Sequence, residues 1–198
     1  MQCKIILVVF IISLTLASST SQNPENGNFC EFLNNFETFR GEDWTRFVEI
    51  LKSTLTKMVT TVPDCPDCRQ YVVFLQDYIA RGDTITPSSS TAHKIDYAKG
   101  FTEAVDRRSS IDLSSYNNEE ALKVTMDYAT QMFAEFSKFR EKLAAEENKL
   151  RRKVGQDFVS KEEEFFELLK TYGGGTTESR REAVANRILS FKQQYQCA

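Results

Sequence analysis

The longest helical pattern in the chain occupies residues 122–150, LKVTMDYATQMFAEFSKFREKLAAEENKL. Apolar side chains recur there every three or four residues and include a seven-residue series, Leu122, Ala129, Phe136, Leu143 and Leu150. This spacing places them on one face of a helix. We expect a long helix from about residue 117 to 154, on the order of 55 Å in length. Neighbouring helices should run along it, or its second half should project.

The same period appears throughout the rest of the chain. Earlier apolar stripes predict helices over residues 29–40, 44–62, 64–81 and 91–105, and later ones predict helices over 160–172 and 179–195. Gly41, Pro63 and Gly82 are expected to end three of these helices. No stretch shows strand-like alternation for more than a few residues. The sequence therefore predicts an all-α bundle of six or seven helices.

The first 21 residues have the pattern of a secretory signal peptide. Lys4 precedes an apolar run from Ile5 to Leu14, and small residues follow up to Ser21. A transmembrane helix needs about 20 apolar residues, so an uncleaved anchor is the weaker alternative. We expect a signal peptide over 1–21, an extracellular all-α domain over 22–198, and no membrane insertion after cleavage.

The charge balance gives no sign of an anionic partner. Loss of Lys4 with the signal leaves 24 basic and 28 acidic side chains, a net charge of −4. Nucleic acids and anionic membranes attract strongly basic faces. We therefore expect no nucleic-acid binding.

Four cysteines remain after cleavage: Cys30, Cys65, Cys68 and Cys197. An even number in an oxidising compartment predicts two disulfides, with three possible connectivities. We favour pairing each terminal cysteine with one member of the central CPDC. The alternative is a local Cys65–Cys68 bridge with Cys30–Cys197. One CxxC without further ligands at metal spacing does not favour zinc.

The CPDC segment also has the spacing of a dithiol redox centre. Two sulfurs in the first turn of a helix would be stabilised as thiolates by the amides and the helix dipole. Thioredoxin-type sites, however, need a strand feeding the helix, and here a helix does so. Asp64 and Asp67 also oppose thiolate formation. A structural disulfide is the favoured interpretation, and thiol exchange is the alternative.

Arg81, Gly82 and Asp83 match the RGD tripeptide through which extracellular ligands engage integrins. The triplet begins a polar stretch, residues 81–90, which we expect to be an exposed loop. Gly82 also falls where a glycine would end a helix, with Arg81 near the negative end of the dipole. We favour helix capping and keep adhesion as an alternative partner-binding role.

Catalytic chemistry has little support in the sequence. His93 is the only histidine, and no nucleophile is spaced to pair with it. The paired acids are typical of solvated faces and helix N-termini. We predict no catalytic, cofactor or metal site and a non-enzymatic protein.

The aromatic content suggests binding as well as packing. Outside the signal there are 14 phenylalanines and seven tyrosines, and most should form the core. The predicted function is binding of an extracellular protein, and the alternative is carriage of a small apolar ligand such as a lipid. Residues 122–150 could also support a homodimer, although packing within one chain is favoured.

Overall fold

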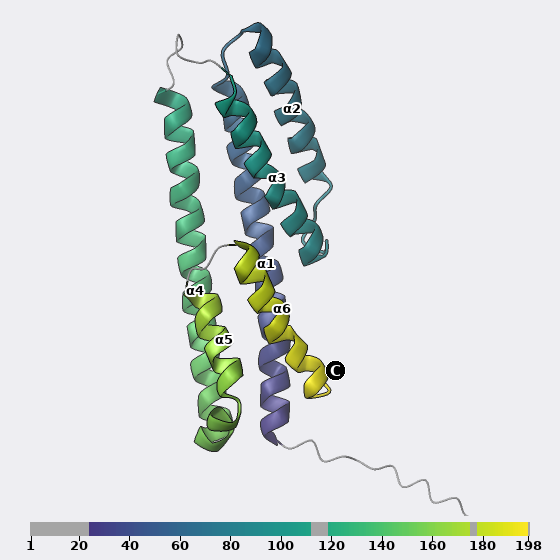
Figure 1. Ribbon diagram of the computed structural model, residues 1–198, viewed down its shortest axis with the longest axis vertical. Helices are drawn as coiled ribbons and strands as arrows, with labels where there is room; N and C mark the ends of the chain where they lie inside the picture. The colour runs from purple at the N-terminus through teal and green to yellow at the C-terminus, as the bar shows by residue number, and fades with distance from the viewer. Residues whose placement is uncertain (1–23, 112–118, 175–177, 198) are drawn as a thin grey trace, which may run out of the picture.

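The computed structural model describes residues 24–111, 119–174 and 178–197, and these residues form helices and no strand (Figure 1). The six helices are α1 (Pro24–Thr60), α2 (Pro66–Asp83), α3 (Thr91–Ser109), α4 (Glu119–Lys161), α5 (Glu163–Gly173) and α6 (Glu178–Gln194). The predicted all-α bundle is confirmed. The predicted signal peptide lies outside the described residues.

Two long antiparallel helices, α1 and α4, run side by side along the molecule (Figure 1). α2 and α3 pack against the later part of α1, whereas α5 and α6 pack around its beginning and the end of α4. We call residues 24–43, 139–161, α5 and α6 the closed half. Residues 44–60, α2, α3 and 119–138 form the open half.

The predicted break at Gly41 is wrong, because α1 continues through it without interruption. Glycine inside a helix costs about 1 kcal/mol relative to alanine. Burial offsets that cost, since Phe39 and Arg40 before the glycine and Asp43 and Trp44 after it are all buried. The first two predicted helices are therefore one helix of 37 residues.

The predicted long helix is confirmed, but it extends past residue 154. Gly155 has φ 78° and ψ 170°, so α4 kinks there and then continues to Lys161. Such a positive φ is accessible to glycine without steric cost. Val154 and Phe158, on either side of the kink, are both buried. The kink keeps both parts of α4 packed on the core.

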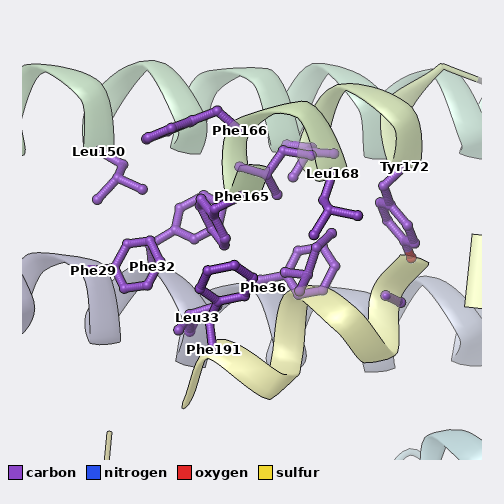
Figure 2. Close-up of a cluster of buried hydrophobic side chains, with 14 of the residues drawn as sticks. Phe29, Phe32, Leu33, Phe36, Leu150, Phe165, Phe166, Leu168, Tyr172 and Phe191 are labelled. Carbon is purple, nitrogen blue, oxygen red and sulfur yellow. The ribbon is translucent and has the colours of Figure 1, made fainter. Parts of the chain in front are cut away.

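The core of the closed half is built mainly from phenylalanine (Figure 2). Phe165 of α5 is fully buried, and its ring centroid lies 4.5 Å from that of Phe29 and 5.2 Å from that of Phe191. Phe29 belongs to α1 and Phe191 to α6, so one ring joins three helices. Edge-to-face contacts of this kind stabilise the core beyond the area they bury.

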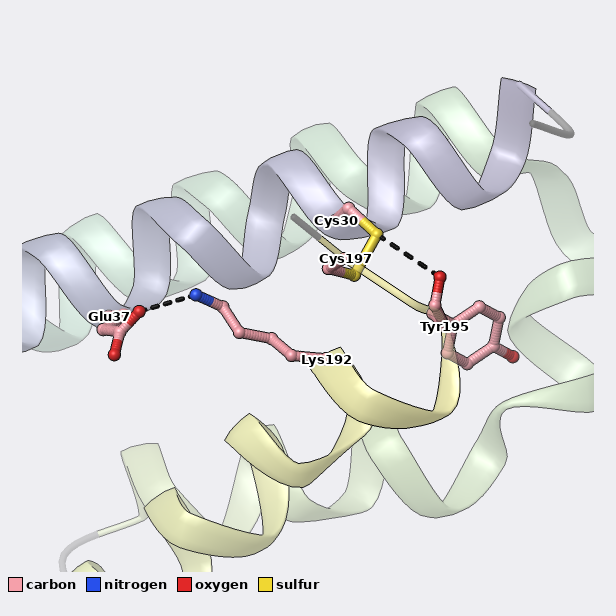
Figure 3. Close-up of a disulfide and its surroundings, with 5 residues drawn as sticks. All are labelled: Cys30, Glu37, Lys192, Tyr195 and Cys197. Atoms are coloured by element: carbon pink, nitrogen blue, oxygen red, sulfur yellow. Dashed lines mark hydrogen bonds and ion pairs between the residues drawn. A yellow bond between two sulfur atoms is a disulfide. The ribbon is translucent and has the colours of Figure 1, made fainter. Parts of the chain in front are cut away.

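The disulfides are Cys30–Cys197 and Cys65–Cys68, so the favoured pairing of the termini with the CPDC segment is wrong. Cys65 and Cys68 lie where α2 begins, in the open half. Cys30 and Cys197 meet in the closed half (Figure 3). Beside the terminal bridge, Lys192 Nζ lies 2.6 Å from Glu37 Oε2 and holds α6 against α1.

Candidate functional site

An apolar groove lies between α3 and α4, with the middle of α1 as its floor. Its volume is about 510 Å³, within the range of roughly 300 to 1,000 Å³ that is usual for small-molecule sites. The lining residues are Trp44, Phe47 and Leu51 of α1, Ala98, Phe101 and Thr102 of α3, Tyr128, Met132, Phe133 and Phe136 of α4, and Arg181 of α6.

The groove is open because α3 covers α1 and leaves the facing side of α4 exposed. Among the described residues, α3 and α4 make no close backbone approach. The rings of Phe101 and Tyr128, with centroids 4.8 Å apart, bridge the two helices instead. Phe133, on the groove wall, is 74% exposed. Together with the other apolar side chains that line the groove, this ring forms an accessible apolar surface of the kind that interaction sites use.

The floor of the groove is rigidly packed. Trp44 and Phe47 are 5% and 4% exposed, and their rings meet edge to face with centroids 5.5 Å apart. Both project from α1, whose backbone is continuously helical through this region. A ligand in the groove would therefore rest on a preformed aromatic surface that includes the only tryptophan of the chain.

Arg181 occupies the end of the groove nearest the closed half. The residue is 9% exposed, and its guanidinium carbon lies 4.5 Å from the Phe136 ring centroid and 4.9 Å from that of Tyr172. Its Nη2 lies 3.5 Å from Asp43 Oδ2. Within the described residues its Nε is buried without a hydrogen-bond partner. The apolar groove thus ends at a buried cation.

A second buried ion pair, Arg40 with Glu182, lies beside Arg181. Arg40 Nε, Glu182 Oε1 and the Tyr172 hydroxyl are also buried without a partner in the described part of the chain. Burial raises the pKa of Asp43 to about 7, and the neighbouring Glu135 adds to the rise, while Arg181 opposes it. Desolvation therefore outweighs the attraction of the ion pair at Asp43.

A larger hollow, of about 800 Å³, lies between α1 and residues 87–94. Its lining carries charges of both signs, including Glu42, Arg46 and Glu49. The buried Lys94 Nζ at its edge donates to the carbonyl oxygen of Pro87 at 2.8 Å. Because charged and polar groups in this hollow already pair with one another, we consider it a weaker candidate for a ligand-binding site than the apolar groove.

The RGD triplet forms the last turn of α2, before the loop that was predicted to carry it. Gly82 is buried, and an added Cβ there would clash with the Tyr97 hydroxyl oxygen. The Asp83 carboxylate lies 2.5 Å from Lys52 Nζ, and the Arg81 guanidinium lies 5.0 Å from the Tyr78 ring centroid. Gly82 thus serves close packing, not termination of the helix as predicted. The adhesion role stays a prediction.

The CPDC segment lies at the N-terminus of α2, as predicted. Cys65 is the N-cap residue, and its Sγ accepts the Cys68 N–H at 3.1 Å. Cys65 is partly exposed, whereas Cys68 is fully buried. Asp64, which opposes a thiolate, is paired with Arg69 at 2.8 Å. Thiol exchange at this bridge remains the alternative to a structural role.

His93 lies exposed in the first turn of α3, where its N–H donates to the Ser90 hydroxyl at 3.2 Å. Among residues 24–111, 119–174 and 178–197, no three potential ligands gather in a way that could hold a metal ion. No helix of that same set combines the length and apolarity that a membrane span requires.

The residues that shape the groove were partly visible in the sequence. Phe133 and Met132 belong to the predicted stripe of the long helix, but their exposure was not foreseen. Arg181 was missed altogether, because it stands among other charged residues, ESRRE, on a helix with a weak apolar pattern. No local sequence pattern distinguishes an arginine that lines a groove from one that is exposed to solvent.

No protein-family model, curated protein or solved structure matches the chain. Its function is therefore argued from the groove and the residues around it.

Proposed function

We propose that the chain is a secreted, non-enzymatic binding protein that carries a small apolar ligand in the groove between α3 and α4. The observation that carries the proposal is the aromatic groove of about 510 Å³ with a largely exposed Phe133 on its wall. Secretion rests on the signal pattern of residues 1–21, and two disulfides are typical of an oxidising compartment.

The size of the groove suits a small molecule. Its volume of about 510 Å³ lies within the roughly 300 to 1,000 Å³ that is usual for small-molecule sites. An elongated apolar molecule could lie within the groove, whereas a partner helix would lay one apolar face along it.

An extracellular protein is the second candidate ligand. Leu122 and Met126, 61% and 62% exposed, extend the apolar surface of α4 beyond the groove wall. A continuous stripe on one helix is typical of a protein-binding surface. It could equally face a second copy of the chain, as the predicted homodimer through residues 122–150 would require.

The proposal is tested with the neutral apolar fluorophore N-phenylnaphthylamine and the secreted protein. Trp44 lines the groove and is the only tryptophan, so a bound probe should quench its emission by energy transfer. We expect saturable binding of one probe per chain. Native mass spectrometry should also show a small endogenous ligand that is lost on denaturation.

Phe133→Ala and Val73→Ala form a matched pair of variants. Both remove an exposed apolar side chain, but only Phe133 lines the groove. Loss of about 1 kcal/mol of apolar contact should weaken probe binding about fivefold in Phe133→Ala, and Val73→Ala should bind like the wild type. Absence of saturable binding, or equal weakening in both variants, would contradict the proposal.

A further inference from the structure

The buried end of the groove holds a cation that the protein pairs weakly. Arg181 is nine-tenths buried and lines the groove. Its contact with Asp43, at 3.5 Å, is longer than the roughly 2.7 to 2.9 Å of a strong charge-assisted hydrogen bond. A buried charge without a close partner is costly, so an acceptor that enters the groove would stabilise this guanidinium.

Aromatic rings fix the orientation of this arginine. Its guanidinium carbon lies within 5 Å of the ring centroids of Phe136, Phe139 and Tyr172. Phe136 also lines the groove, so the cation lies where the apolar wall ends. A planar guanidinium presents donors in a fork that matches the two oxygens of a carboxylate.

The surrounding charges leave room for an additional anion. The groups facing the cluster are Arg40 and Asp43 of α1, Glu135 and Lys142 of α4, Tyr172 of α5, and Arg181 and Glu182 of α6. Arg40 is paired with Glu182. Burial raises the pKa of Asp43 to about 7, so near neutral pH this carboxyl is partly protonated and neutralises Arg181 incompletely.

We infer that the ligand of the groove is a long-chain carboxylic acid, with its carboxylate at Arg181 and its hydrocarbon chain against Trp44, Phe101 and Phe133. The inference rests on the proposed function and adds the chemical class of the ligand. The aromatic walls would contact the hydrocarbon chain of the ligand, and the buried Arg181 at one end of the groove would fix the direction in which the ligand lies.

The test compares oleate with oleyl alcohol, which has the same chain and no charge. Binding is followed by displacement of N-phenylnaphthylamine, read through Trp44, in the wild type and in Arg181→Gln. We expect oleate to bind the wild type about tenfold more tightly than the alcohol. Arg181→Gln should remove that preference, so that the acid and the alcohol bind within about twofold of each other.

A second variant, Asp43→Asn, keeps the inference testable if Arg181→Gln does not fold. It removes the competing carboxylate while keeping the shape of the side chain. Oleate should then bind severalfold more tightly than to the wild type, and binding of the alcohol should not change. Circular dichroism melting checks the fold of each variant.

The outcomes separate the two proposals. Equal binding of oleate and oleyl alcohol by the wild type, unaffected by either variant, would overturn the acidic headgroup and leave the apolar groove standing. Failure of the probe, the acid and the alcohol to bind at all would overturn the carrier function as well. Preference for oleate that is lost in Arg181→Gln, or strengthened in Asp43→Asn, supports both.

Discussion

The closed and open halves use the same two long helices in opposite ways. In the closed half, α5 packs against α4 and α6 against α1, and α5 and α6 also pack against each other. Phe29, Phe36 and Phe165 are consequently fully buried there. In the open half, α2 and α3 pack against α1 without a close backbone approach to α4, and Phe133 on α4 remains 74% exposed.

The difference between the halves shows which apolar side chains of the long helices become buried when the chain folds. Phe139 and Phe133 belong to the same helix but lie about 120° apart around its axis, and Phe139 is 4% exposed whereas Phe133 is 74% exposed. Apolar side chains that no element of the chain covers do not contribute to its core. We therefore expect the closed half to contribute more to stability, and the proposed ligand-binding surface lies in the open half.

The largest contrast should come from the two disulfides. The Cys30–Cys197 bridge spans 167 residues and Cys65–Cys68 spans 3. In the chain-entropy model, closing these loops stabilises the folded state by about 5 kcal/mol for Cys30–Cys197 and about 2 kcal/mol for Cys65–Cys68. Replacing Cys30 and Cys197 by serine should lower the free energy of unfolding, measured in urea, far more than replacing Cys65 and Cys68. Equal losses would show that the contribution of each bridge does not follow the length of the loop that it closes.

A pair of phenylalanine variants sharpens the comparison. Phe165→Ala removes a fully buried ring that contacts α1 and α6, and should cost about 3 to 5 kcal/mol of unfolding free energy. Phe133→Ala removes an exposed ring and should cost less than about 1 kcal/mol. Urea unfolding followed by circular dichroism measures both. A similar cost for the two rings would show that the open half is as tightly packed as the closed one.

Apolar periodicity predicted the helices well, because each stripe reflects the side of a helix that the fold buries. It failed at Gly41, where continuity depends on Trp44 and Asp43 being buried by other helices. It also could not choose the disulfide pairing, since four cysteines allow three connectivities and only the packing of α6 on α1 brings Cys197 to Cys30.

The candidate site was less predictable than the fold. Asp43 and Arg181 are 138 residues apart in the sequence, and neither belongs to a recognisable motif. Their proximity depends on how α6 meets the middle of α1. The exposure of Phe133 likewise depends on α3 staying away from α4, which no local pattern encodes.

The pH dependence of stability tests the boundary between the halves. Asp43 has a pKa of about 7 in the folded protein against 3.8 for an unperturbed side chain, so the folded state holds its proton more tightly than the unfolded state. The free energy of unfolding should therefore fall as pH rises from about 4 to 7, by on the order of 3 kcal/mol. The Asp43→Asn variant, which has no carboxyl to titrate at this position, should lack this part of the fall in unfolding free energy.

The measurement is urea unfolding of the wild type and Asp43→Asn at several pH values between 4 and 8. Subtracting the two curves cancels the titration of the other groups, provided that their environment is unchanged. A difference that does not vary with pH would show that folding does not shift the pKa of Asp43, and one that favours the wild type increasingly as pH rises would show that Arg181 stabilises the carboxylate.

The smallest effect on stability should come from the exposed stripe of α4. Leu122 and Met126 are 61% and 62% exposed, so Leu122→Lys and Met126→Lys should change the free energy of unfolding by no more than about 0.5 kcal/mol. Leu143 and Leu150 of the same heptad series are buried within the chain, and we therefore expect a monomer by light scattering. If the wild type is instead a dimer and these substitutions dissociate it, the stripe serves self-association. A second copy of the chain would then cover the surface that is exposed in the open half.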